Sequence, residues 1–161
     1  MSDLANIRLL AFDIDGVFTD GRFYLSDEGV ETKAFSTQDG FGIRRALEAG
    51  LEIAVISGRS SKAVSIRMQE LGVQHVYLAS KDKVAALEEL AASLDIALDD
   101  CAFVGDDVPD LALLERVGLP IAVANAVTEV RDASAMTTVA RGGHGAVREV
   151  CDRVVAAKRV P

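Results

Sequence analysis

The sequence predicts an α/β protein built on a doubly wound parallel sheet, and two observations support this fold class. Short apolar runs rich in Ile, Val and Leu alternate with segments whose apolar residues recur at helical spacing. The short runs are apolar throughout, which is typical of parallel strands that are buried on both faces. Strands that alternate with helices form βαβ units. The 161 residues contain no linker or repeat, so we expect one domain over 1–161.

The first predicted strand, 7–12, is apolar except for one Arg. A β-hairpin is expected next, because two alternating runs, 22–26 and 30–35, flank an acidic turn that ends in glycine at 27–29. A hairpin directly after the first strand is therefore part of the predicted fold.

The rest of the chain repeats the alternation of strands and helices. The first helix is expected over 41–49, with Asp39 as its N-cap and Gly50 as its C-terminal stop. Further strands are predicted at 52–56, 76–78, 101–104, 121–123 and 136–139, and further helices at 61–71, 82–94, 109–117, 127–133 and 146–157.

Composition excludes several classes of function. The formal net charge of −8 disfavours binding to nucleic acid, because a phosphate backbone would be repelled at long range. No segment reaches the about 18 apolar residues that a membrane span needs. Residues 1–6 lack the basic start and apolar run of a secretory signal, so we expect a cytoplasmic protein without a membrane partner. Cys101 and Cys151 are expected to be reduced core residues.

Polar side chains gather where the predicted strands end. In an open α/β sheet the ligand lies beyond the carboxyl ends of the strands, so residues just past each strand are candidates for a site. The residues that follow these strands or open the next helix are Asp13, Asp15, Ser57, Arg59, Lys83, Asp106, Asp107 and Asp110. Several carboxylates, one hydroxyl and one ammonium are thus expected at one edge of the sheet.

Carboxylates this close repel one another unless a cation neutralises them. Mg²⁺ prefers oxygen ligands and uses few carboxylates, and Asp13, Asp106 and the backbone carbonyl of Asp15 would suit it. Ser57 and Lys83 can then bind the oxygens of a phosphoryl group. With this charge cancelled, a carboxylate can attack phosphorus.

Four motifs of this chain resemble those of the haloacid dehalogenase superfamily and occur in the same order. They are Asp13-Ile-Asp-Gly-Val17, Ser57-Gly-Arg59, Lys83 and Gly105-Asp-Asp-Val-Pro-Asp110. The resemblance implies that Asp13 is the nucleophile and Asp15 the general acid and base. It also implies that Ser57 and Lys83 hold the phosphoryl group and that Asp106 binds magnesium. The second Asp of the first motif marks phosphatases and phosphomutases, which favours phosphoryl transfer here.

Finer features resemble the 3-deoxy-D-manno-octulosonate 8-phosphate phosphatases of this superfamily. The segments that carry the likeness are 13–21, 36–40, 56–59 and 142–150. The predicted hairpin and helix already occupy the segment between Asp15 and Ser57, so no cap domain fits there. The resemblance implies a capless homotetramer, assembled through hairpins, that hydrolyses this sugar-acid phosphate with Mg²⁺. The residues that would contact substrate are Asp15, Ser36, Thr37, Gln38, Asp39, Gly40, Arg44, Arg59, Arg67 and Lys83.

Alternative interpretations remain open at this point. Another nonulosonate phosphate, such as an acylneuraminate 9-phosphate, is an alternative substrate, and a phospho-signalling receiver domain is an alternative from a different class. Arg44 and Arg67 could be solvated helix surface. Helix capping could be the whole role of Asp107 and Asp110. The glycine-rich segment 142–145 is either a cover for a neighbouring subunit's site or a plain loop before the last helix.

Overall fold

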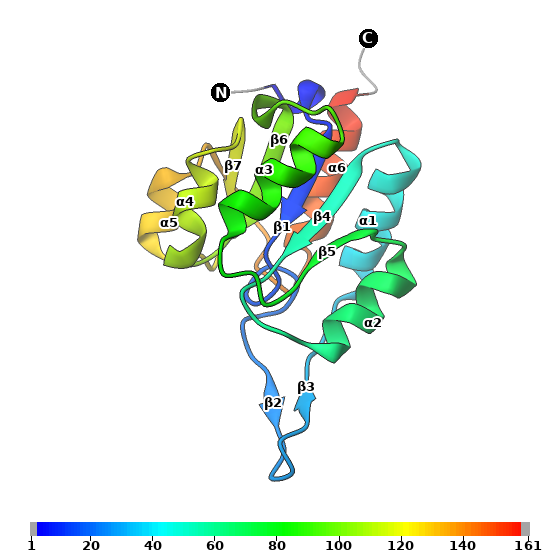
Figure 1. The fold of residues 1–161 in the computed structure, drawn as a ribbon, viewed down its shortest axis with the longest axis vertical. Helices are drawn as coiled ribbons and strands as arrows, with labels where there is room; N and C mark the ends of the chain where they lie inside the picture. The colour runs from blue at the N-terminus through cyan, green and yellow to red at the C-terminus, as the bar shows by residue number, and fades with distance from the viewer. Residues whose placement is uncertain (1–2, 159–161) are drawn as a thin grey trace.

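The fold is a six-stranded parallel sheet with helices on both faces, followed along the chain for residues 3–158 in a computed structural model (Figure 1). The strands lie in the order β5-β4-β1-β6-β7-β8. Their bounds are β1 Leu9–Phe12, β4 Glu52–Ile56, β5 His75–Tyr77, β6 Cys101–Gly105, β7 Leu119–Ala122 and β8 Met136–Thr137. The predicted doubly wound parallel sheet is confirmed.

Two helical layers cover the sheet. Helices α1, α2 and α6 form one layer, and α3, α4 and α5 form the other (Figure 1). Their bounds are α1 Thr37–Glu48, α2 Lys62–Leu71, α3 Lys83–Ser93, α4 Leu111–Leu114, α5 Thr128–Ala133 and α6 Ala146–Lys158. Short 3₁₀ turns lie at η1 Leu4–Asn6, η2 Leu98–Asp100 and η3 Val108–Asp110.

The strand order reverses at β1, and this reversal places the site. The chain moves from β1 to β4 and β5 on one side, then returns to β6 on the other. Phe12, the last residue of β1, is level with Val55 of β4 and Val104 of β6. The residues that follow these three strands therefore meet at a topological switch point, where ligands of such sheets bind.

The core holds the loop after β1 in place. All four residues of β1 are buried, and so are Ile14, Val17 and Phe18 in the loop that follows. The Phe18 ring meets that of Phe12 edge-on, with ring centroids 5.5 Å apart. The apolar residues of this loop point into the core, which leaves Asp13 and Asp15 at the edge of the sheet.

The predicted hairpin is present and extends away from the body of the protein (Figure 1). Its strands, β2 Tyr24–Leu25 and β3 Glu31–Thr32, pair antiparallel. The turn between them closes where Ser26 N donates to Val30 O over 3.0 Å and Gly29 N to Ser26 O over 2.9 Å. The ladder pairs two residues of each strand and is shorter than the two alternating runs suggested.

Two helix predictions were wrong in their bounds. Helix α1 begins at Thr37, and Ser36 is its N-cap in place of Asp39. Gly40 and Gly42 weaken the helical signal of this segment in the sequence. Contact with α6 overrides that signal, since Gly42 lets α6 approach so closely that a side chain there would meet the backbone of Arg148.

The predicted helix 109–117 is shorter than expected. It consists of the 3₁₀ turn η3 and the four residues of α4, and it ends at Leu114. Val117 fits the apolar pattern because it is buried, although it lies beyond the helix. A residue can thus be buried without being helical, and the spacing of apolar residues in the sequence indicates only which residues are buried.

Three smaller expectations concern the cysteines and the membrane. Cys101 and Cys151 are free and buried, as predicted, and burial raises the pKa of the Cys101 thiol to about 11. No helix within residues 3–158 is long and apolar enough to cross a membrane.

Candidate active site

A pocket of about 300 Å³ opens where β1, β4 and β6 end. Its lining includes all eight candidates that follow the predicted strands or open the next helix, namely Asp13, Asp15, Ser57, Arg59, Lys83, Asp106, Asp107 and Asp110. They come from three strand ends and from the first turn of α3, which Asp82 caps by accepting a hydrogen bond from Ala85 N. The topology of the sheet, and not proximity along the chain, assembles this pocket.

Lys83 links two of the carboxylates. Its Nζ lies 2.9 Å from Asp13 Oδ1 and 2.7 Å from Asp110 Oδ1. Burial and the neighbouring Asp110 raise the pKa of Asp13 to about 6, although Lys83 acts in the opposite direction. Burial alone would lower the pKa of Lys83, but the two carboxylates outweigh it and raise that pKa. Lys83 therefore remains an ammonium in a mostly dry position.

We call Asp13, Asp106 and Asp110 the carboxylate cluster, because their carboxylate oxygens lie within 4.8 Å of one another. Burial, followed by the charges of Asp13, Asp110 and Asp107, raises the pKa of Asp106 to about 8. One ammonium thus faces three carboxylates, and the excess negative charge fits a hard divalent cation such as Mg²⁺.

Asp110 has a different place in the cluster from the other two carboxylates. Its Oδ1 accepts from Lys83, and its Oδ2 accepts from the backbone N–H of Asp106 at 3.0 Å. Its side chain also closes a capping box with Asp107 around η3. The Asp13 side chain is 12% exposed and Asp106 is half-buried, whereas the Asp110 side chain is 2% exposed. Asp110 thus caps a helix, as one interpretation held, and also anchors Lys83, which the spacing alone did not reveal.

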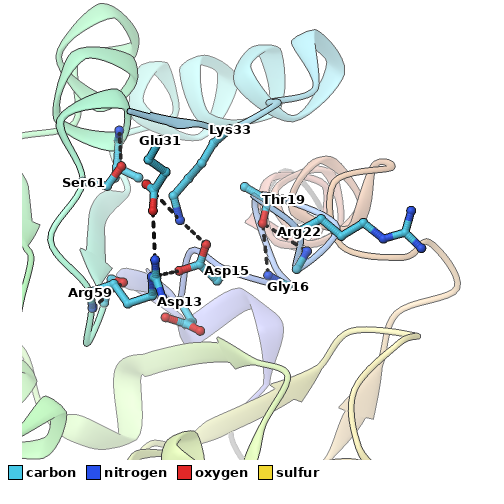
Figure 2. A network of polar contacts seen from close by, with 12 residues as sticks. Asp13, Asp15, Gly16, Thr19, Arg22, Glu31, Lys33, Arg59 and Ser61 are labelled. Carbon is cyan, nitrogen blue, oxygen red and sulfur yellow. Dashed lines mark hydrogen bonds and ion pairs between the residues drawn. The ribbon is translucent and has the colours of Figure 1, made fainter. Parts of the chain in front are cut away.

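The Asp15 carboxylate points away from that of Asp13 and toward Lys33 (Figure 2). It accepts a hydrogen bond from Lys33 and lies 3.8 Å from Arg59 Nε. The predicted metal ligand is the backbone carbonyl of Asp15. The orientation of the side chain does not test that prediction. Lys33 was missed from the sequence, because a lysine in an alternating hairpin strand usually faces solvent.

Close backbone packing holds the loop that carries Asp15. Gly16 has φ of +86°, and Thr19 Oγ1 accepts from the N–H groups of Gly16 and Gly21 at 3.2 Å each. The Asn125 side chain joins this loop to the C-terminal segment, since it donates to Gly16 O at 3.2 Å and accepts from Gly142 N at 2.6 Å.

The glycine-rich segment 142–145 packs against its own chain at this point. Side chains at Gly142 or Gly143 would collide with the backbone of residues 16–20. The close approach explains why these two residues are glycines. His144 follows in the turn and is exposed. His75 is a residue of edge strand β5 that pairs with Glu52 at 3.0 Å.

The remaining predicted substrate contacts lie elsewhere. Thr37, Gly40, Arg44 and Arg67 line a second pocket of about 500 Å³, between α1 and α2. The two arginines contact Glu70 there, Arg44 through the backbone carbonyl and Arg67 through the carboxylate. This pocket shares no lining residue with the first. Within one chain, these residues do not join the carboxylate cluster.

The other residues of segment 36–40 have local roles in this structure. Ser36 caps α1, and Gln38 is exposed. Asp39 is buried and accepts a hydrogen bond from Arg148 N at the start of α6, over 2.9 Å. Burial raises the pKa of this carboxyl. Asp39 thus joins α1 to α6, and its side chain is closed off from both pockets.

Comparison with known proteins agrees with the geometry. A family described as haloacid dehalogenase-like hydrolase matches residues 75–149. The 3-deoxy-D-manno-octulosonate 8-phosphate phosphatase KdsC of Escherichia coli (strain B / BL21-DE3) is 44% identical over 158 residues, which covers 98% of this chain and 84% of the relative. The chain belongs to the 3-deoxy-D-manno-octulosonate 8-phosphate phosphatase family of haloacid dehalogenase-like hydrolases.

Solved structures share this fold closely. The phosphatase of this family from Moraxella catarrhalis, in complex with magnesium ion, phosphate ion and KDO, is 42% identical, has a TM-score of 0.94, and covers 96% of this chain and 89% of its own. The cobalt-bound form from Haemophilus influenzae is 34% identical with a TM-score of 0.93, covering 96% and 91%. Membership of this family rejects the receiver-domain alternative.

Gly16 offers a test of the close packing beside Asp106. A methyl group at Gly16 would overlap the Asp106 carboxylate, whereas nothing lies near one at Gly29, whose φ of +78° is similar. Gly16→Ala and Gly29→Ala should share the backbone cost of about 1 kcal/mol, but only Gly16→Ala should weaken Mg²⁺ binding. Thermal unfolding with and without Mg²⁺ measures both effects. If Mg²⁺ stabilised Gly16→Ala as much as it stabilises the wild type, the methyl group would not displace Asp106, and the prediction would be wrong.

The raised pKa values predict how stability depends on pH without metal. Asp106 has a folded pKa of about 8, above the roughly 3.9 of an unfolded Asp, so its contribution to stability is lost as pH rises toward 8. In EDTA, wild-type stability should therefore fall between pH 6 and pH 8, and Asp106→Asn should remove most of that slope. Mg²⁺ should restore wild-type stability at pH 8 but leave Asp106→Asn unchanged. If stability depended equally on pH in both proteins, Asp106 would not be the group whose protonation causes the dependence.

Proposed function

We propose that this protein is a magnesium-dependent phosphatase that hydrolyses 3-deoxy-D-manno-octulosonate 8-phosphate, in lipopolysaccharide biosynthesis. The observation that carries the proposal is the pocket in which Asp13 meets Lys83 and Asp106 at the switch point of the sheet. The relatives named above add the substrate, since their names specify this sugar-acid phosphate.

The chemistry begins at Asp13. Its carboxylate attacks phosphorus to form an aspartyl phosphate, and the sugar oxygen leaves. Asp15 donates a proton to that oxygen, then accepts one from the water that hydrolyses the aspartyl phosphate to free phosphate. Bound Mg²⁺, held by Asp13, Asp106 and the backbone carbonyl of Asp15, would neutralise the phosphate charge that repels the nucleophile.

Other residues of the pocket bind the substrate. Lys83 already contacts Asp13 at 2.9 Å, so its ammonium lies where the oxygens of the attacked phosphoryl group must come. Ser57 is buried beside it and supplies a hydroxyl. Arg59 is half-exposed, stacked over the Phe23 ring at 4.3 Å, and its planar guanidinium suits the carboxylate of a sugar acid.

A panel of phosphate esters tests the proposed function. In Mg²⁺, we expect the 8-phosphate of 3-deoxy-D-manno-octulosonate to react faster than acylneuraminate 9-phosphate, the alternative substrate, and faster than glucose 6-phosphate. Asp13→Asn should abolish phosphate release, and Asp15→Asn should lower kcat by about 10²–10⁴-fold. Phosphate release measured with EDTA as the control checks each point. A preference for the acylneuraminate ester would replace the proposed substrate, and an active Asp13→Asn would remove the proposed mechanism.

We also propose that the protein assembles as a homotetramer through its hairpin. The hairpin carries a group of exposed apolar side chains, namely Phe23, Tyr24, Leu25 and Val30. Apolar side chains gathered on a projecting element are typical of a protein–protein interface. The expectations of a single domain over 1–161 and of a cytoplasmic location stay predictions.

Assembly would give the second pocket a function. Arg44 and Arg67 lie outside the pocket of Asp13 in their own chain, yet the family resemblance assigns them to substrate. We infer that a neighbouring subunit contributes them, which would close a site that has no cap domain. Two positive guanidinium groups face one negative carboxylate and a neutral backbone carbonyl, so the pocket has positive charge left over for an anionic ligand.

Mixed oligomers test this arrangement. Chains with Asp13→Asn and chains with Arg67→Ala should each be nearly inactive on the sugar-acid phosphate. When the two are co-expressed with different tags and purified through both, activity should return, because some sites combine an intact Asp13 with a neighbour's intact Arg67. Doubly tagged Asp13→Asn oligomers are the control. If the mixture stays inactive while light scattering shows a tetramer, Arg67 does not act across subunits.

A further inference from the structure

We propose that Lys33, at the base of the hairpin, is a positioning residue that holds the Asp15 carboxylate in place for proton transfer. The inference rests on the proposed function, in which Asp15 is the general acid and base. It adds a residue that neither the motifs nor the pocket lining point to.

Lys33 belongs to a square of alternating charges (Figure 2). Its Nζ donates to Asp15 Oδ1 and lies 3.7 Å from Glu31 Oε1. Across the square, Arg59 lies 2.9 Å from Glu31 Oε2 and 3.8 Å from Asp15 Oδ2. Each carboxylate thus faces both cations, and the Asp15 side chain is held from two sides.

Burial makes the contact with Lys33 the firmer of the two. The side chain of Lys33 is 1% exposed, whereas that of Arg59 is 50% exposed and can turn to a ligand. Lys33 hydrogen-bonds Asp15, whereas Glu31 Oε1 lies 3.7 Å away, and a buried ammonium that loses its hydrogen-bonded carboxylate is strongly unfavourable. The Phe23 ring, 5.8 Å from Nζ, covers it further.

Asp15, and not Lys33, is the member of this pair that lines the pocket. Its side chain is 24% exposed and lines the pocket, while Lys33 stays outside the lining. Lys33 can therefore act on substrate only through Asp15. Proton transfer needs the carboxyl group within hydrogen-bond reach of the leaving oxygen, and a displacement of about 1 Å can cost about 10²-fold in rate. Without Lys33, Asp15 would keep only the contact with Arg59, at 3.8 Å from a half-exposed side chain.

A different role is conceivable for the same contact, which is to fasten the hairpin to the body of the protein. Kinetics separate the two roles. A fastener would affect stability and assembly, whereas a positioning residue affects kcat and depends on Asp15. The variants needed are Lys33→Met, Lys33→Arg, Asp15→Asn and the double variant Lys33→Met with Asp15→Asn, with Lys62→Met at an exposed lysine as the matched control.

The experiment measures kcat and KM on the sugar-acid phosphate, after light scattering and circular dichroism confirm assembly and folding. Lys33→Met should lower kcat by about 10–100-fold with KM nearly unchanged. Lys33→Arg should recover part of kcat, and Lys62→Met should match wild type. Lys33→Met should add little to the loss already caused by Asp15→Asn, because both changes remove one function.

Two results would overturn the inference. One is a kcat of Lys33→Met equal to that of wild type. The other is a double variant whose fold loss in kcat equals the product of the losses of the two single variants. If Lys33→Met fails to fold, Lys33→Gln, which is polar but uncharged and shorter than lysine, must show a fall in kcat. If the wild-type protein itself had no phosphatase activity, the proposed function would be wrong. A failure of the proposed function can therefore be distinguished from a failure of the inference about Lys33.

Discussion

The concentration of negative charge at the carboxyl ends of β1 and β6 is the constraint on which the site depends. Asp13, Asp106 and Asp110 lie together with one ammonium, that of Lys83, among them. Burial, followed by the charges of the neighbouring carboxylates, raises the pKa of Asp106 to about 8, an unfavourable arrangement for a protein without metal. The same arrangement suits a cation and a phosphate together, because each cancels charge that the other would leave exposed. The site gives up stability in the metal-free state for this purpose.

Placing carboxylates so close requires backbone geometry that few residues allow. Gly16 adopts a positive φ, and a side chain there would overlap the Asp106 carboxylate. Asn125 ties the same loop to Gly142, so a segment near the C-terminus supports the residues after β1. The buried Ile14 and Phe18 hold the loop from the core side. The position of Asp15 is thus determined by packing on one side and by Lys33 and Arg59 on the other.

The hairpin connects the site to the outside of the molecule. Lys33 and Glu31, in and just after strand β3, contact Asp15 and Arg59, while Tyr24 and Leu25 of the paired strand β2 are about two-thirds exposed. A single chain therefore presents an open pocket and an uncovered apolar element. Both features are understandable if subunits complete one another, because a capless site otherwise leaves the reaction open to water.

The sequence by itself determined the fold class and the members of the pocket. The switch-point rule places residues after parallel strands together, so Asp13, Ser57 and Asp106 could be grouped without coordinates. Helix bounds were less predictable: tertiary contact at Gly42 overrides the weak local propensity of the first turns of α1. Asp39 looked like a cap or a ligand, but it is buried against α6. The tertiary structure alone decided that Lys33 holds Asp15, that Asp110 anchors Lys83, and that Arg44 and Arg67 lie in a second pocket. These contacts join segments far apart in the chain, and local spacing carries no information about which charged side chains meet across such distances.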